Sequence, residues 1–388
     1  MEVQPFTVKI PQTVLDDLRE RLARTRWPDE IANSDWERGA KLSYMRELSE
    51  YWQTRFDWRA EEQALNALAH FRAEIDGFGI HFIHERGKGR HPLPLIITHG
   101  WPGSFLEMRK ILPLLTDPAG CGADANDSFD VIVPSLPGYG FSDCATQAGM
   151  NAFAIADLWA RLMSGLGYQR FGAQGGDWGA SVTTCLAYAH PNHLAGIHLN
   201  YIPGSLRPFT GPGATELSEA ERGFLADSEQ WWQSEGGYAH IQRTKPQTLA
   251  YALNDSPVGL AGWIVEKFRD WSDCDGDVEQ RFSKDELLTN VTLYWVTETI
   301  HASTRLYNET ATRPLHFRED ERIQVPCGVV RFQKEAPFPP REWVERCYDV
   351  QRWTEFPRGG HFAAMEEPEL LVQDIRAFFR PLRPSGTD

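Results

Sequence analysis

The segment 175–179, Gly-Gly-Asp-Trp-Gly, constrains the fold of this chain more than any other. An apolar run at 171–174 precedes it and has the pattern of a strand, while the Ala- and Leu-containing stretch 180–189 that follows has the pattern of a helix. Glycines two positions before and two positions after Asp177 permit a strained turn that leaves this side chain alone at the tip. The segment therefore predicts a strand–turn–helix unit that presents one reactive group.

Other parts of the chain repeat this order of strand, turn and helix. Short apolar runs at 93–98 and 130–134 each lead into a glycine-bearing turn, at 99–103 and 136–140, and a helical stretch follows at 155–166. Alternating strands and helices predict an α/β fold with a mostly parallel central sheet and helices on both faces. The turns should cluster at the carboxyl ends of the strands, where such sheets bind ligands.

The remaining segments predict additions to this sheet. A hairpin is expected where residues 71–75 and 80–85 flank Asp76-Gly77, and helices are expected at 14–22 and 42–56. The middle of the chain is rich in Trp and Tyr and has mainly helical patterns, which predicts an inserted cap with helices at 219–232, 259–268 and 284–307. The α/β pattern then resumes with strands at 325–332 and 351–356 and a last helix at 368–379. The predicted division is an amino-terminal helical segment at 1–75 that wraps core and cap, the first part of the core at 76–203, the cap at 204–320 and the second part of the core at 321–388.

Composition narrows the classes of partner. The formal net charge of −15 argues against nucleic acid or an anionic membrane, because phosphate binding needs a positive surface. The amino terminus has no apolar signal region, and no apolar run reaches the length of about 18 residues that a spanning helix needs. The six cysteines form no metal-ligand pattern, which indicates free thiols in a reducing compartment. We expect a cytoplasmic protein without membrane anchor, metal or cofactor; the oligomeric state is left open, with a homodimer as one option.

An aspartate at the tip of the turn favours a particular chemistry. Its carboxylate is ionised at neutral pH, so Asp177 can attack an sp³ carbon without a base and form an alkyl ester. A water molecule activated by a histidine must then hydrolyse that ester. This scheme fits an epoxide or a carbon–halogen bond and does not fit ordinary ester hydrolysis.

The turns also offer the other groups that this scheme needs. His361, the last of twelve histidines, follows the last predicted strand and so matches the chain order of nucleophile, acid and histidine. The N–H groups of Trp101 and Trp178 could form an oxyanion hole for the tetrahedral intermediate. The acid should follow the strand at 325–332, where the pattern alone leaves four carboxylates open: Glu335, Glu342, Glu345 and Asp349.

Taken together, three motifs resemble the microsomal-type epoxide hydrolases, including the juvenile hormone epoxide hydrolases. These are His-Gly-Trp-Pro-Gly-Ser at 99–104, the turn around Asp177, and Gly-Gly-His-Phe-Ala-Ala at 359–364. An amino-terminal stretch from Pro5-Phe6 to Trp27-Pro28-Asp29 is similar as well, so the resemblance covers nearly the whole chain. It implies an α/β-hydrolase fold with a helical cap and an amino-terminal helical extension. The microsomal enzymes carry a membrane anchor before the shared region, and this chain begins almost at that region, so no anchor is expected here.

The resemblance also implies roles for individual residues. Asp177 matches the nucleophile, His361 the base and Glu335 the acid, and two cap tyrosines, Tyr238 and Tyr307, match the pair that hydrogen-bonds the epoxide oxygen. The implied reaction converts a small apolar epoxide and water to a vicinal diol. The nearest alternative is a haloalkane dehalogenase, which shares the aspartate and histidine but needs N–H donors for halide. A further alternative is a catalytically inactive binding protein with the same fold.

Overall fold

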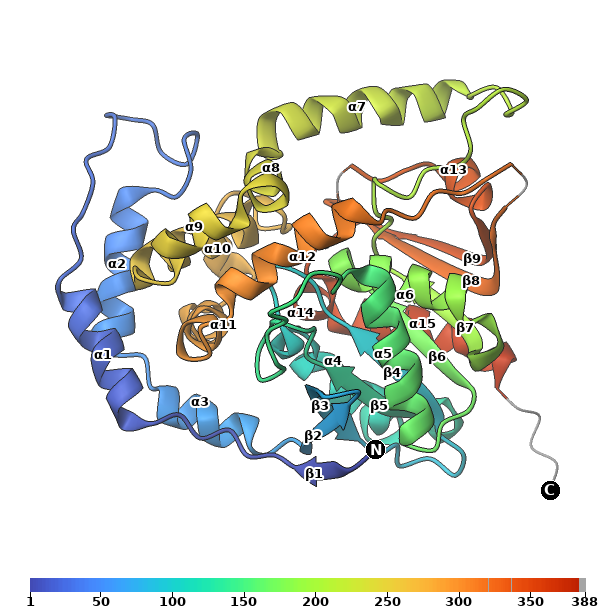
Figure 1. Ribbon diagram of the computed structural model, residues 1–388, viewed down its shortest axis with the longest axis horizontal. Helices are drawn as coiled ribbons and strands as arrows, with labels where there is room; N and C mark the ends of the chain where they lie inside the picture. Colours follow the sequence, from blue (N-terminus) through green and yellow to red (C-terminus); the bar gives the residue numbers. More distant parts are fainter. Residues whose placement is uncertain (320, 336, 384–388) are drawn as a thin grey trace.

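The computed structural model describes residues 1–319, 321–335 and 337–383 of the chain (Figure 1). Its strands form one sheet in the order β1-β2-β3-β5-β4-β6-β7-β8-β9. The neighbouring pairs β1–β2, β2–β3 and β3–β5 are antiparallel. The remaining neighbours, in the order β5-β4-β6-β7-β8-β9, all pair parallel. Their bounds are β1 (Val3–Pro5), β2 (His70–Ile75), β3 (Phe78–Glu85), β4 (Leu93–Thr98), β5 (Phe129–Pro134), β6 (Phe171–Gly175), β7 (Leu194–Leu199), β8 (Ile323–Phe332) and β9 (Tyr348–Phe356). The predicted mostly parallel sheet is therefore confirmed.

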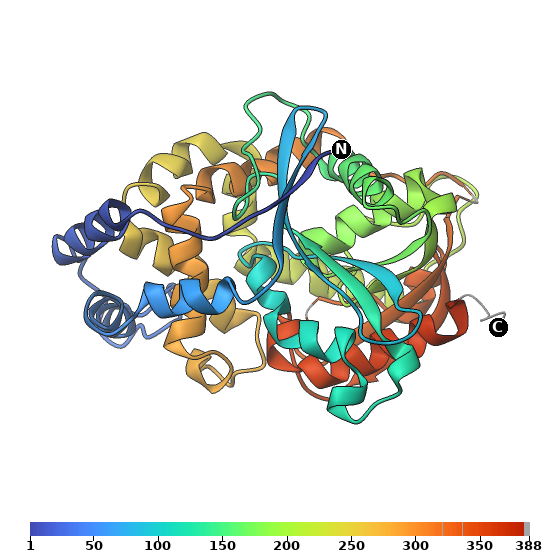
Figure 2. The same ribbon diagram turned by 90° about the horizontal axis from the view of Figure 1, so that it is seen from below.

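Helices cover both faces of this sheet. Every residue of β5 and of β7 is buried, which is expected for central strands enclosed on both sides. In Figure 2 the helices α5 (Ala152–Gly165) and α6 (Asp177–Ala189) lie on one side of the sheet, and α4 (Ile111–Thr116) and α15 (Pro368–Phe379) lie on the other. Two short helices, α13 (Arg341–Glu345) and α14 (Ala363–Glu366), complete the carboxyl-terminal part.

The chain between β7 and β8 forms helices that gather beside one edge of the sheet (Figure 1). They are α7 (Glu219–Glu235), α8 (Gly237–Thr244), α9 (Pro246–Leu253), α10 (Pro257–Asp270), α11 (Lys284–Val296) and α12 (Ile300–Thr312). We refer to α7–α12 as the cap. The prediction of a single helix at 284–307 is wrong, because this stretch contains α11 and most of α12.

The break between these two helices has a local cause. Glu298 adopts a left-handed conformation with φ +54°, which an α-helix does not accommodate. The flanking Thr297 and Thr299 share a side-chain hydrogen bond of 2.8 Å, and Thr297 also donates to the carbonyl oxygen of Leu293. Hydroxyl side chains of this kind compete with helix continuation. The apolar periodicity continues on both sides of the break, and for this reason it did not reveal the break.

The amino-terminal helices α1 (Gln12–Ala23), α2 (Leu42–Thr54) and α3 (Trp58–Leu65) lie beside the cap (Figure 2). The buried indole N–H of Trp52 donates to Thr292 of α11 at 2.9 Å, and Arg21 pairs with Asp255 at 2.7 Å. The segment thus links the edge strand β1 to the cap. The domain boundaries proposed at 75, 203 and 320 stay predictions; residue 320 and the stretch 384–388 lie outside the described residues.

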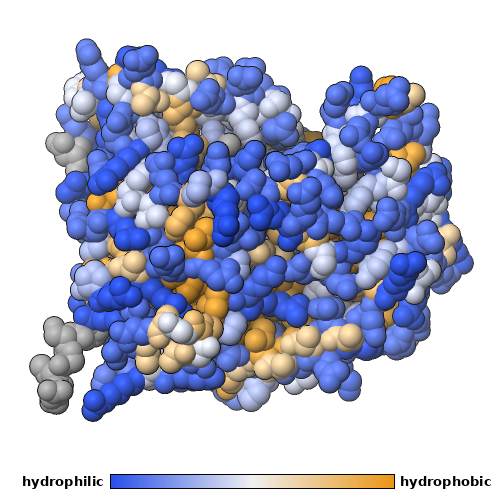
Figure 3. Space-filling view, turned by 180° about the vertical axis from the view of Figure 1, so that it is seen from behind, coloured by the Kyte–Doolittle hydropathy of each residue, from blue (hydrophilic) through white to orange (hydrophobic). Residues whose placement is uncertain are grey.

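The face seen in Figure 3 is mainly hydrophilic, with apolar side chains in smaller groups between the polar ones. Among the helices in the described ranges, none combines the length and the apolar character that crossing a membrane requires.

Candidate active site

Asp177 stands at the sharp turn between β6 and α6. Its backbone is left-handed, with φ +48°, although it is not glycine. The turn depends on close backbone approach, because a Cβ on Gly179 would overlap the carbonyl oxygen of Thr98 and one on Gly175 would overlap the backbone of Gly179. A strained non-glycine residue fixed by its neighbours is typical of functional positions.

The two carboxylate oxygens of Asp177 have different surroundings. The backbone N–H of Trp101 donates to Oδ1 at 2.8 Å, while Oδ2 lies 3.5 Å from Nε2 of His361. Oδ1 therefore occupies the position of an oxyanion, and Oδ2 is the oxygen directed toward the histidine. In the part of the chain that the structure describes, no hydrogen bond joins the N–H of Trp178 to this carboxylate, although Trp178 follows Asp177 directly.

His361 is held between two carboxylates. Its Nδ1 lies 3.0 Å from Oε2 and 3.1 Å from Oε1 of Glu335, whose side chain is buried, while Nε2 faces Asp177. The backbone N–H of His361 donates to the carbonyl oxygen of Trp271 at 2.8 Å, so the cap helps to hold this turn. Burial opposes protonation of the imidazole, but the charges of Glu335 and Asp177 outweigh burial and raise the pKa of His361 well above its ordinary value.

The other candidate acids lie elsewhere. Glu342 accepts a hydrogen bond from the hydroxyl of Ser218, Glu345 pairs with Arg341 at 2.6 Å, and Asp349 lies on β9. The pattern alone could not separate these residues from Glu335, because all of them follow β8 within 17 positions of its end. The separation depends on which loop bends toward His361.

The two tyrosines come from different cap helices and meet above the nucleophile turn. Tyr238 of α8 and Tyr307 of α12 have ring centroids 6.0 Å apart. The ring of Tyr238 stacks on Trp101 at 5.3 Å, and the ring of Tyr307 packs edge-on against Trp178 at 4.7 Å. Burial raises the pKa of both phenols, so both remain neutral hydrogen-bond donors.

Two cavities adjoin Asp177 and His361. The larger, of about 80 Å³, combines polar and charged groups with an aromatic part of its wall formed by Tyr201, Phe224, Trp231, Trp232, Tyr238 and Trp271. The smaller, of about 20 Å³, is lined by Glu107, Gln174 and Asn200 among others. A space of this size accommodates about one water molecule when polar groups line it.

Glu107 is a member of this site that the sequence analysis did not identify. Burial raises its pKa to about 8, while the charges of His361 and Asp177 act in opposite directions on it. A carboxyl group with such a pKa is partly neutral at physiological pH and can donate or accept a proton. Its place eight positions after His99, in the same turn region as the His-Gly-Trp-Pro motif, was the available signal.

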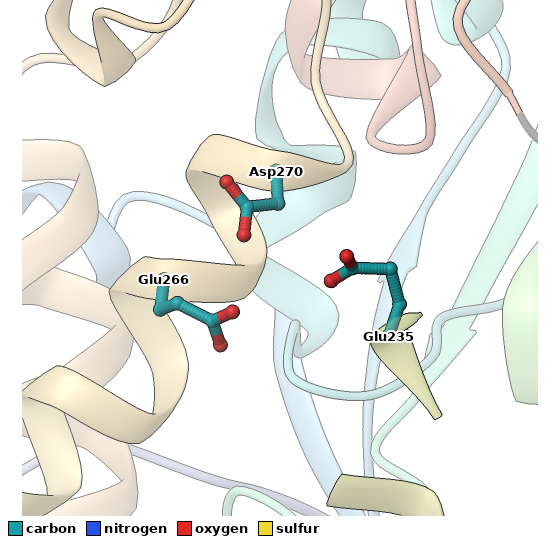
Figure 4. Close-up of side chains that lie close together, drawn as sticks. All are labelled: Glu235, Glu266 and Asp270. Carbon is teal, nitrogen blue, oxygen red and sulfur yellow. The ribbon is translucent and has the colours of Figure 1, made fainter. Parts of the chain in front are cut away.

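Three more carboxylates gather on the cap helices α7 and α10. Glu235 at the end of α7 and Glu266 and Asp270 of α10 place their carboxylate oxygens within 4.8 Å of one another, and Figure 4 shows them directed toward a common space. Such a set could in principle hold a cation. The ammonium of Lys267, however, lies 2.7 Å from Glu266 and already supplies positive charge.

The fold and the site define a class of enzyme before any comparison. A parallel sheet with an inserted helical cap, a nucleophile position at a strand-to-helix turn and a histidine–carboxylate pair from later turns is the arrangement of an α/β hydrolase. The family model described as alpha/beta hydrolase fold matches residues 94–291, and the one described as epoxide hydrolase N terminus matches residues 3–108.

Individual relatives extend this match to nearly the whole chain. Epoxide hydrolase 1 of Oryctolagus cuniculus is 40% identical, over 97% of this chain and 88% of its own. The crystal structure of the juvenile hormone epoxide hydrolase from Bombyx mori is 31% identical, with a TM-score of 0.84, over 98% of this chain and 94% of that one. The Aspergillus niger epoxide hydrolase is 31% identical, with a TM-score of 0.86, over 99% and 97%. The chain belongs to the epoxide hydrolase family and is a hydrolase, which confirms the resemblance found in the sequence.

Proposed function

We propose that this hydrolase converts small apolar epoxides to vicinal diols through a covalent ester on Asp177. The observation that carries the proposal is the divided environment of this carboxylate: Oδ1 accepts the Trp101 N–H, and Oδ2 faces His361. One carboxylate oxygen is thus stabilised where an oxyanion would later form, and the other is available for attack.

In the first step, Oδ2 of Asp177 attacks one ring carbon of the epoxide, and the bond between that carbon and the ring oxygen breaks. The oxygen leaves as an alkoxide and takes a proton from Tyr238 or Tyr307. Neutral phenols suit this task, because they donate hydrogen bonds to the developing negative charge without needing a base themselves. The products of the step are a hydroxyalkyl ester and a tyrosine that regains its proton from solvent.

In the second step, His361 removes a proton from water, and the resulting hydroxide attacks the ester carbonyl carbon of Asp177. The tetrahedral oxyanion is stabilised by the Trp101 N–H, with the Trp178 N–H as the second proposed donor. When it collapses, the ester C–O bond breaks and the leaving alkoxide takes the proton held by His361, which completes the diol and restores the neutral imidazole. Asp177 then loses its remaining proton to solvent and is a carboxylate again. Glu335 orients the imidazole and balances its positive charge while the proton is held there.

The smaller cavity offers a place for the water of this second step. It adjoins Asp177 and His361, and Glu107 supplies a polar wall. The aromatic part of the larger cavity's wall favours epoxides that carry an aryl or alkyl group. The family membership of the chain supports epoxide and water as the two substrates.

The test measures diol formation from styrene oxide beside halide release from a bromoalkane. Diol without halide is expected. Halide release without diol would show a dehalogenase instead, and binding of styrene oxide without any diol would show an inactive binding protein.

A further inference from the structure

We propose that Lys267 is a positioning residue for ring opening, because its buried ammonium lies over the ring of Tyr238. It thereby holds positive charge next to the phenol whose O–H donates to the epoxide oxygen. This inference rests on the proposed function and adds a residue of α10 to it. Lys267 is 5% exposed, and its Nζ lies 4.8 Å from the centroid of the Tyr238 ring and 5.8 Å from that of Trp271.

The burial of this ammonium needs an explanation. A lysine head group has three N–H donors and normally stays in water. Within the described ranges, the acceptor that Lys267 reaches is the Glu266 carboxylate, at 2.7 Å from Oε2 and 3.0 Å from Oε1. The remaining face of the ammonium is turned to two aromatic rings, whose faces attract cations. The Glu266 carboxylate and the two rings together hold the positive charge of Lys267 beside the ring of Tyr238.

Two contacts between α8 and α10 fix this geometry. Tyr238 and Gln242 stand one helical turn apart on α8, and Trp263 and Lys267 stand one turn apart on α10. The indole N–H of Trp263 donates to Oε1 of the buried Gln242 at 2.9 Å, while Lys267 reaches Tyr238. The two helices are therefore bridged by two contacts one turn apart, and the Trp263–Gln242 hydrogen bond helps to hold α10 where Lys267 faces Tyr238.

The chain just after Lys267 also contacts the histidine that acts in the second step. Trp271 lies four positions after Lys267, and its carbonyl oxygen accepts a 2.8 Å hydrogen bond from the backbone N–H of His361. Lys267 itself lies against Tyr238, which acts in ring opening, while Trp271 holds the histidine that acts in ester hydrolysis. A substitution at Lys267 should therefore slow the first step selectively.

Charge explains why the lysine matters beyond packing. Glu235, Glu266 and Asp270 lie within 4.8 Å of one another beside it (Figure 4). Asp270 is already paired with Arg269 at 2.5 Å, whereas Glu266 pairs with Lys267. Without the Lys267 ammonium, the Glu266 carboxylate would lack this partner and would repel the alkoxide that forms at the phenol. With the ammonium in place, the charge nearest the ring is positive and favours that alkoxide.

The experiment uses styrene oxide and full-length protein, in a His361→Gln background in which the ester on Asp177 accumulates. Intact mass against time gives the rate of ester formation. Lys267→Met is expected to slow it about tenfold, as loss of a desolvated cation–π contact would. Lys267→Arg should recover most of the rate, because it keeps the charge and stacks on rings. Ester hydrolysis, measured with His361 present, should be unchanged.

Two further variants separate this role from a merely structural ion pair. Glu266→Gln removes the lysine's partner but leaves its charge, so ester formation should remain at least as fast as with Glu266. Lys284→Met is the matched control. Its ammonium also faces a tyrosine ring, that of Tyr44 at 5.9 Å, and also pairs with carboxylates, but these partners, Glu47 and Glu279, lie outside the site. It should not change the rate.

A second readout is the dependence on the phenol. In a Tyr238→Phe background the Lys267→Met substitution should have little further effect, because the group that transmits the charge is gone. The inference is overturned if Lys267→Met forms ester within twofold of the parent rate, or if Glu266→Gln loses as much as Lys267→Met. Where Lys267→Met does not fold, Lys267→Gln takes its place, because it also removes the charge; ester formation within twofold of the parent rate would overturn the inference there too. Failure of the proposed function is a separate result: no ester would form even in the parent His361→Gln protein.

Discussion

Asp177, His361 and Glu335 lie on turns that follow strands of the core, whereas Tyr238 and Tyr307 lie on helices of the cap. We call these the core half and the cap half of the site. The core half is fixed by short polar contacts, such as the 2.8 Å bond from the Trp101 N–H to Asp177 and the 3.0 Å contact between His361 and Glu335. The cap half is fixed by ring packing on Trp101 and Trp178. In the proposed mechanism this difference assigns one chemical step to each half: the directional contacts of the core half serve proton transfer at the ester, and the phenols of the cap half serve ring opening.

The largest effect is expected from substitution of His361, the proposed catalytic base of the core half. His361→Gln should leave ester formation intact but abolish its hydrolysis, lowering turnover by about 10⁵-fold or more, as loss of a catalytic base does elsewhere. Intact mass after addition of styrene oxide should show a stable adduct on Asp177. His301→Gln is a control outside the site, and absence of an adduct in the His361 variant would contradict the two-step scheme.

Glu335→Gln tests the electrostatic support of the core half. Turnover should fall by about 10³- to 10⁴-fold, since the imidazole loses the group that orients it. Because Glu335 raises the pKa of His361, its removal lowers that pKa, so the acid limb of ester hydrolysis should move to lower pH. Rates of hydrolysis measured against pH check the sign. Glu342→Gln should shift nothing, and an unmoved limb in Glu335→Gln would assign the acid to another residue.

Substitution in the cap half should act on the other step. Tyr238→Phe combined with Tyr307→Phe should slow ester formation by about 10³-fold, because the leaving oxygen loses both donors. Hydrolysis of an ester once formed should stay near the parent rate. Single-turnover experiments separate the two rates, with Tyr251→Phe on the exposed face of α9 as control. Equal rates of ester formation in the double variant and the parent would refute the assignment of the tyrosines.

The smallest expected effect concerns Glu107. Glu107→Gln keeps the shape of the side chain but removes a group whose pKa burial raises to about 8. Hydrolysis should slow by about tenfold, in the range of an auxiliary proton-transfer group, while ester formation stays unchanged. Pre-steady-state measurement of both steps decides. A slower first step with a normal second step would assign Glu107 to ring opening and not to ester hydrolysis.

The sequence by itself determined the core half to a large extent. The glycine spacing around Asp177 is dictated by backbone overlap with Thr98 and within the turn, which is a local requirement that a sequence must display. The position of His361 after the last strand follows from chain order. The alternating pattern of strands and helices led to the correct fold class, because strands buried on both faces need continuous apolar runs, as in β4 and β5.

Only the tertiary structure decided which residues meet across distant segments. By pattern alone Glu335 stood among four candidates, and resemblance selected it before the structure placed its carboxylate 3.0 Å from His361. Tyr238 and Tyr307 were also chosen by resemblance, since any buried tyrosine in a helical cap has the same local pattern. Lys267 had no signal of its own, and Glu107 had only its place in the turn region after His99. Their roles depend on burial, on distances of a few ångströms to groups more than 25 positions away, and on neighbouring charges. Contacts between residues so far apart in the chain follow no periodicity or spacing rule, because they form only when the chain folds.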